Sequence, residues 1–227
     1  MKQMFDREYP VTSILLIITT IIFILMFASY GFQYEGLEAL YQFGAVHGST
    51  IQVDPGQFWR VFSAIFIHIG LEHFVVNTLT LYFLGRQIEA IFGSWKFLLL
   101  YLMSGVMGNV FVIYFSPDTL AAGASTSLFG LFSAVIVLRY TTRNYYIQQL
   151  GQSYMSLLAV NLIMSFLPGI SLAGHLGGLV GGALGAVILP VSGESYAFTL
   201  FQRLMATLAY IGLALFLIFM LFQRPFH

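Results

Sequence analysis

Long apolar stretches, separated by short polar ones, make up most of this sequence. A helix that crosses a membrane needs roughly 20 apolar residues. Pro117, Pro168 and Pro190 fall between stretches, as expected for a residue without a backbone donor. The pattern predicts seven membrane-spanning helices, at Val11–Ser29, Leu71–Phe92, Trp95–Phe115, Ala122–Tyr140, Tyr154–Leu167, Ser171–Leu189 and Leu204–Phe222.

One long connection, at residues 30–70, separates the first two predicted helices. It contains several Phe residues, and Trp59 stands next to Arg60, a combination typical of a segment in the headgroup region of a bilayer. Seven helices use about 140 residues, which leaves no room for a second soluble domain. We therefore expect residues 1–227 to form a single membrane domain, with a core at 11–190, an interfacial loop at 30–70 and an extra C-terminal helix at 204–222.

The composition supports a membrane protein. Hydrophobic residues make up 59% of the chain and charged residues 8%, against about 25% charged in an average soluble domain. A formal net charge of zero and the low charge content exclude a basic nucleic-acid-binding patch and an ordinary soluble globule. Cys is absent, which excludes disulfides and thiolate metal sites. The lipid bilayer is the expected surrounding, and no nucleic acid, metal or cofactor is expected.

The distribution of Lys and Arg predicts the orientation. With a cytoplasmic N-terminus, the inner side holds Lys2, Arg7, Arg86, Lys96, Arg139, Arg143 and Arg203, while the outer side holds Arg60 and Arg224. Basic residues are enriched in cytoplasmic loops. We therefore expect a multi-pass protein of a bacterial plasma membrane, with the N-terminus cytoplasmic and the C-terminus external.

Four polar side chains fall inside predicted helices, where such groups are costly and mark functional sites by default. Ser125 and His175 each lie four or five residues from the outer end of a helix, roughly 6–8 Å below the external interface. His73 and Asn77 are spaced i, i+4 and share one helix face at a similar depth. We expect the four groups to meet near the external side.

This set of side chains has a definite chemistry. A neutral His can take the proton of a Ser hydroxyl and so activate it as a nucleophile. Acyl transfer also needs donors aimed at the developing oxyanion, which His73, Asn77 and a backbone N–H near Ser125 could supply. The helix dipole at Ser125 favours negative charge there. Because no Asp or Glu lies at matching depth, we expect a Ser–His dyad.

Glycines recur every four residues in the sixth predicted helix, as in Gly174, Gly178 and Gly182. The fourth helix carries Gly123, Ser127, Gly130 and Ala134 in a similar pattern. Small residues at this spacing let two helices approach closely in lipid. Such packing would bring Ser125 and His175 within hydrogen-bond distance, as the predicted chemistry requires.

The combined motifs resemble the rhomboid family of intramembrane serine proteases. The resemblance covers residues 59–189, which is the six-helix core without its first helix, and the seventh helix is similar to an extra C-terminal helix in some members. It implies an all-α polytopic membrane protein with a rhomboid-like six-helix bundle. The matching stretches are Trp59-Arg60, His68-IGLE-His73-FVV-Asn77, Gly85-Arg86-QI-Glu89-AIF-Gly93, Gly123-Ala124-Ser125 and Gly174-His175-LGGLVGG.

The resemblance also implies roles. Ser125 would be the nucleophile, His175 the general base, and His73 and Asn77 the oxyanion-binding residues. The supporting residues would be Trp59 and Arg60 in a loop half-submerged in the membrane, Arg86 and Glu89 as a structural pair, and His68 in an oxyanion-side or structural role.

Two positions depart from the family pattern. Thr126 stands where the family usually has Gly, and its β-branched side chain restricts the local backbone. Phe129 stands where a Tyr commonly packs on the catalytic His, and it keeps the ring but loses the hydroxyl. The first change affects the expected oxyanion geometry and efficiency; neither removes a reacting group.

The function expected from these residues is an intramembrane serine endopeptidase. It would cleave single-pass transmembrane substrates near the external face through an acyl-enzyme. The alternatives are a catalytically weak or inactive rhomboid-like protein that binds transmembrane helices, and a transporter or channel built on the same polar residues. A zinc site at His68, Glu72 and His73 lacks the spacing of known motifs. GASTSLFG is not a G-x-S-x-G elbow, which argues against a soluble hydrolase.

Overall fold

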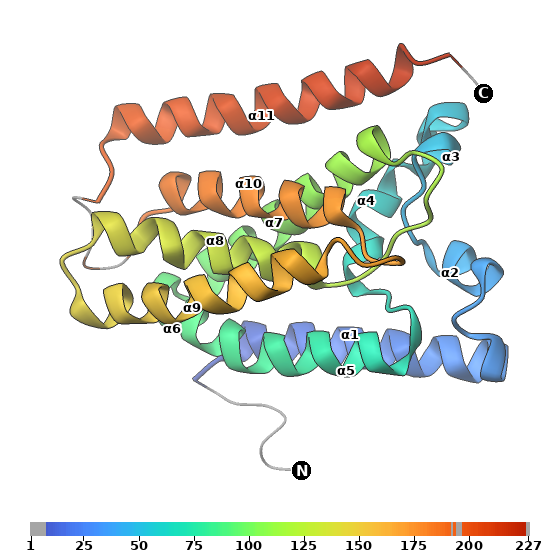
Figure 1. The fold of residues 1–227 in the computed structure, drawn as a ribbon, viewed down its shortest axis with the longest axis horizontal. Coiled ribbons are helices and arrows are strands. Elements are labelled where there is room, and N and C mark those ends of the chain that lie inside the picture. Colours follow the sequence, from blue (N-terminus) through green and yellow to red (C-terminus); the bar gives the residue numbers. More distant parts are fainter. Residues whose placement is uncertain (1–7, 192, 194–196, 226–227) are drawn as a thin grey trace.

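A computed structural model describes residues 8–191, 193 and 197–225 of the chain, and its regular elements are helices. Figure 1 shows the long helices alongside one another, with the short helices α2, α3 and α4 gathered at one end. The helices are α1 (Pro10–Tyr30), α2 (Leu37–Phe43), α3 (Gly48–Val53), α4 (Arg60–Ser63), α5 (Gly70–Thr80), α6 (Arg86–Phe92), α7 (Ser94–Phe115), α8 (Ser125–Thr141), α9 (Tyr145–Met164), α10 (Leu172–Ile188) and α11 (Leu200–Phe222).

The predicted all-α fold is confirmed, and each of the seven predicted spans is occupied by helix. Among the described residues, three helical segments are long and apolar enough to cross a membrane: 10–33, α7 and α11. Residues 55–66 and 70–92 form a fourth candidate that is bent by 75°. Helices α8 and α10 are apolar but have only 17 residues each. Seven crossings therefore stays a prediction, as does the orientation, and Lys2 and Arg7 lie outside the described residues.

The prediction for the fifth helix was wrong at its start, because α9 begins at Tyr145, nine residues before the predicted Tyr154. The side chain of Asn144 caps the helix by accepting a hydrogen bond from the backbone N–H of Tyr146 at 2.9 Å. Glutamines interrupt the apolar pattern in the first turns, but Ile147 is buried on the opposite face. The first half of α9 is therefore amphipathic, and a prediction based on continuous apolar stretches does not include it.

The connection between α1 and α5 is folded into short helices, and its Arg60 is buried and hydrogen-bonded within it. Arg60 is only 4% exposed, although an interfacial loop predicts an Arg among headgroups. Its guanidinium donates to Gln57 Oε1 at 2.9 Å and to the backbone oxygens of Tyr41 and Ala45. Trp59, by contrast, is 47% exposed. Arg60 thus holds the end of α2 against α4, while the neighbouring Trp59 side chain faces outward.

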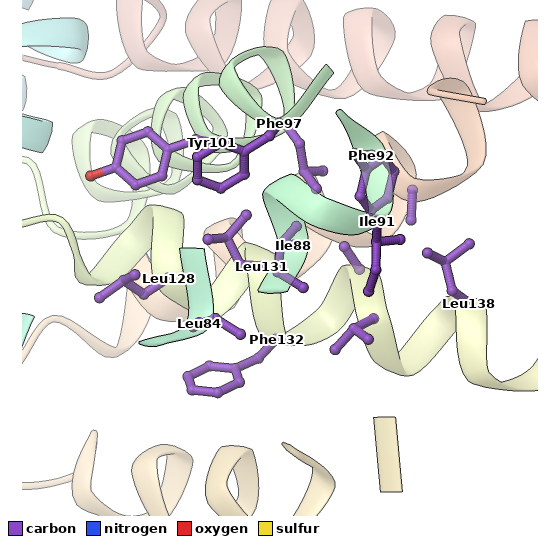
Figure 2. Close-up of a cluster of buried hydrophobic side chains, with 14 of the residues drawn as sticks. Leu84, Ile88, Ile91, Phe92, Phe97, Tyr101, Leu128, Leu131, Phe132 and Leu138 are labelled. Atoms are coloured by element: carbon purple, nitrogen blue, oxygen red, sulfur yellow. The ribbon is translucent and has the colours of Figure 1, made fainter. Parts of the chain in front are cut away.

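The core lies where the second predicted span packs against α7 and α8. This span runs as α5, a π-helical turn at residues 81–85, and α6. Figure 2 shows buried side chains of the cluster, including Leu84, Ile88, Phe92, Phe97, Tyr101, Leu128, Leu131 and Phe132. Helix α10 packs against α7 and α8, α9 against α8, and α11 against α10 and α7. Helix α8, which begins at Ser125, is therefore held from several sides.

Glu89 and Arg86 of α6 make different contacts: Glu89 bonds to the start of α1, and Arg86 contacts two tyrosines. The Glu89 carboxylate is 2% exposed and accepts hydrogen bonds from Val11 N at 3.0 Å, Thr12 N at 2.8 Å and Thr12 Oγ1 at 2.7 Å. It satisfies backbone donors in the first turn of α1, which a helix cannot pair internally. Arg86 donates to the Tyr82 hydroxyl at 2.6 Å and stacks over Tyr9. Glu89 thus caps the start of α1.

Replacing Glu89 with Gln is expected to lower the free energy of unfolding by about 2 kcal/mol, because hydrogen bonds to a charged acceptor contribute roughly 1.5–3 kcal/mol. Thermal unfolding of the full chain in detergent micelles measures this. The matched control is Glu38→Gln, at an exposed position of α2. Equal unfolding midpoints for the two variants would contradict the capping role.

Candidate active site

Ser125 is the first residue of α8, and the backbone before it is fixed by Gly123. Gly123 has a φ of +140°, a conformation that L side chains rarely adopt, and its N–H donates to Ala64 O at 2.9 Å. A methyl group at this position would lie 2.6 Å from Cε1 of His73. Glycine is thus required here both for the backbone turn and for the close approach of the His73 ring.

His175 lies in the first turn of α10, after Ser171, whose hydroxyl accepts from Gly174 N as an N-cap. Its Nε2 lies 2.9 Å from Ser125 Oγ. Figure 1 shows that α8 and α10 both begin at the end of the bundle that carries α2, α3 and α4. The structure therefore brings the predicted nucleophile and base into hydrogen-bond contact at one end of the membrane-embedded helices.

Close packing of α8 and α10 makes this contact possible. A methyl group added at Gly178 would overlap the backbone of Thr126, and one added at Gly182 would overlap the backbone of Gly130. The reciprocal addition at Gly130 would lie 2.9 Å from Gly178 O. The two backbones thus touch without intervening side chains, along the stripe of small residues that the sequence predicts.

Two further side chains, Phe129 and Thr126, lie next to Ser125 and His175. The Phe129 ring is stacked on His175, with centroids 3.9 Å apart and an interplanar angle of 10°. Thr126 is 6% exposed, and its side chain lies against Gly108 and Gly174. Because Thr126 has no positive φ, the backbone at this position does not require glycine.

His68, two residues before α5, and His73 within α5 both lie beside the start of α8, whereas Asn77 bonds to its own helix. Ala124 N donates to Nε2 of the fully buried His68 at 3.4 Å, and the rings of His68 and His73 are 5.2 Å apart. His73 Nδ1 accepts from Ile69 N at 3.4 Å, and the ring edge bearing Nε2 faces Gly123. Asn77 is buried, and its amide donates to His73 O at 2.8 Å.

Ser165 is a site residue that the sequence analysis missed. It is the C-cap residue that follows α9, is 2% exposed, and its Oγ lies 2.6 Å from His175 Nδ1. The sequence offers no signal for this contact, because Ser165 stands ten residues before His175 and in a different helix. The predicted pair of Ser125 and His175 is therefore extended on the far side of the imidazole by a second hydroxyl.

The arrangement has the components of nucleophilic catalysis. A hydroxyl contacts an imidazole nitrogen, and the imidazole is held by a third group, which is the geometry that activates a serine. Ser125 is partly exposed, whereas His175 is buried. Within the part of the chain that the structure describes, no three His, Asp or Glu side chains gather as a candidate metal site.

Comparisons with known proteins agree with these observations. A family model described as Rhomboid domain matches residues 55–192. "Rhomboid protease GluP" of Bacillus subtilis (strain 168) is 35% identical over 193 residues, 84% of this chain. "Putative rhomboid protease YdcA" of the same organism is 29% identical over 184 residues, 80% of this chain. "Inactive RHOMBOID-like protein 8" of Arabidopsis thaliana is 29% identical over 126 residues, 55% of this chain.

The matches differ in how much of each relative they cover. The aligned part corresponds to 36% of GluP, 89% of YdcA and 36% of the Arabidopsis protein. This chain thus spans about a third of the length of the first of these relatives. The family model includes Ser125, His175, His73 and Asn77, and α1 and α11 lie outside it.

Proposed function

Because this chain belongs to the rhomboid family, we propose that it is an intramembrane serine endopeptidase that cleaves substrates with a single transmembrane helix. The observation that carries the proposal is the 2.9 Å contact between Ser125 Oγ and His175 Nε2 at the starts of two tightly packed helices. A hydroxyl and an imidazole placed this way inside apolar helices need a functional reason.

The reaction follows from the two side chains. Ser125 Oγ attacks the scissile carbonyl carbon while its proton moves to His175 Nε2. The tetrahedral intermediate collapses, the C–N bond breaks, and His175 gives the proton to the leaving amine. A water molecule then attacks the acyl-enzyme with His175 again as base. The substrate helix must unwind at the cut, so helix-weakening residues such as Gly are favoured there.

The developing oxyanion needs donors close to Ser125. We assign this role to the Ser125 backbone N–H, His73 and Asn77. The His73 ring lies against Gly123, two residues before the nucleophile. One N–H of the Asn77 amide donates to His73 O, and the same amide carries a second N–H that we assign to a substrate oxygen. His68, bonded to Ala124 N, supports the loop before Ser125.

The predicted orientation places this chemistry near the external membrane face. Arg60 and Arg224 belong to the end of the bundle that carries α3, since Gln52 of α3 donates to Arg224 O at 2.7 Å. Arg86 and Lys96 lie near the junction of α6 and α7, at the other end. This distribution of basic residues supports a cytoplasmic N-terminus and a plasma-membrane protein.

A catalytically inactive helix-binding protein is the second candidate function. A relative named inactive and the Thr126 departure favour it. The dyad contact argues for catalysis, because a binding protein has no need of a nucleophile in contact with a base.

The deciding experiment labels the detergent-solubilised full chain with a fluorophosphonate and maps the adduct by mass spectrometry. We expect an adduct on Ser125, cleavage of a reporter carrying one transmembrane helix, and loss of both in Ser125→Ala. Ser133→Ala, which removes a buried hydroxyl bonded to Leu179 O, is the matched control. Reporter binding without labelling would support the inactive alternative, and normal cleavage by Ser125→Ala would refute the assignment.

A further inference from the structure

We propose that Ser165 is a positioning residue that fixes the tautomer and the orientation of His175. The inference rests on the proposed function, since it concerns the competence of the base. Three contacts hold the imidazole: Nε2 to Ser125 Oγ at 2.9 Å, Nδ1 to Ser165 Oγ at 2.6 Å, and the ring face against Phe129. The dyad thus becomes a chain of three side chains, with a neutral hydroxyl in place of a carboxylate.

Counting protons along this chain gives the tautomer. Ser165 Oγ lies 2.8 Å from the backbone oxygen of Asn161, and a carbonyl only accepts. The single proton of the Ser165 hydroxyl is therefore donated to Asn161 O. Only lone pairs of Ser165 Oγ remain to face His175, so Nδ1 must carry the proton of the neutral ring. Nε2 is then unprotonated and accepts from Ser125, as general-base catalysis requires.

The position of Ser165 follows from the end of α9. Its backbone N–H bonds back to Asn161 O at 3.0 Å, which closes the last turn of the helix. Most side chains of the last two turns of α9 are exposed, whereas Ser165 is 2% exposed. The one buried residue at this end of α9 is thus a polar one directed at His175. The hydroxyl proton is satisfied by Asn161 O, and the lone pairs that remain on Oγ face His175 Nδ1.

Removing the Ser165 oxygen would leave Nδ1–H without an acceptor in a buried site. The ring could then adopt the other tautomer, in which Nε2 carries the proton and cannot accept from Ser125. Rotation of the ring would also be less restricted. We expect Ser165→Ala to lower kcat about 10- to 100-fold, as loss of a partner that fixes a histidine tautomer does at other sites. KM should change little, because Ser165 is not placed to touch substrate.

The first test measures reporter cleavage and the rate of fluorophosphonate labelling of the full chain in detergent. Ser165→Ala should slow both, and Ser165→Thr, which keeps the hydroxyl, should restore most of the rate. Ser133→Ala is the matched control, because it also removes a buried hydroxyl, but one that bonds to Leu179 O and not to the His175 ring. An equal loss in Ser133→Ala, or full activity in Ser165→Ala, would overturn the inference.

The second test does not depend on turnover. Nitrogen NMR of ¹⁵N-histidine-labelled protein distinguishes a protonated from an unprotonated ring nitrogen. We expect His175 in the wild type to carry its proton on Nδ1, and Ser165→Ala to populate the Nε2–H form. A wild-type His175 protonated on Nε2 would overturn the inference even if the enzyme is active. A wild type that neither cleaves nor labels would instead refute the proposed function and leave the tautomer assignment to be judged by this measurement.

Discussion

Replacing His175 with Ala is expected to lower kcat for reporter cleavage by roughly 100- to 10,000-fold, the range that a positioned general base contributes. Its Nε2 is the one basic atom that the structure places in contact with Ser125 Oγ, among the described residues. Without it the Ser125 hydroxyl keeps its proton and is a weak nucleophile. KM should change little, since the lost interaction acts on the nucleophile and not on substrate binding.

The double variant Ser125→Ala/His175→Ala provides the sharper result. Because the two residues act as one unit, we expect it to be no slower than the more severely affected single variant. His47→Ala is the control for loss of a histidine, because this side chain has a local role: it accepts a hydrogen bond from Thr50 N at the start of α3. Multiplicative losses in the double variant would mean that Ser125 and His175 act independently, and would contradict a dyad.

The sequence allowed the helical fold and the main pair of side chains to be predicted because both leave strong local signals. Continuous apolar stretches identify α1, α7 and α11, and polar residues within such stretches are rare enough to single out Ser125 and His175. Depth along a helix is simple to calculate from its rise. The expected proximity of Ser125 and His175 thus required only their depths and the glycine pattern of their helices.

Other features depend on three-dimensional packing and could not be predicted. The first half of α9 faces α8 with only part of its surface, so its glutamines concealed the true helix start. Arg60 is buried because three nearby oxygens accept its protons, and these come from separate turns of the connection between α1 and α5. Ser165 reaches His175 only through the path of the chain between α9 and α10. No residue spacing encodes either contact.

Replacing Gly182 with Ala is expected to lower the free energy of unfolding by about 3 kcal/mol, at the upper end of the usual cost of overpacking a core. The added methyl group would overlap the Cα and carbonyl atoms of Gly130 on α8. These are backbone atoms, so no rotation of a side chain can relieve the overlap, and α8 and α10 must separate. His175 lies two turns before Gly182 on α10, and the separation should therefore also lower activity.

The matched control for Gly182→Ala is Gly212→Ala in α11, where nothing lies within 4 Å of an added methyl group. There the same substitution should stabilise the helix by about 0.5–1 kcal/mol, because Ala loses less backbone entropy than Gly. Thermal unfolding in one detergent, followed by circular dichroism, compares the two variants. Opposite shifts of the midpoint would attribute the loss at Gly182 to contact between α8 and α10. A fall of similar size in both variants would mean that the detergent-solubilised helices tolerate no change at glycine, and that close packing at Gly130 is not the cause.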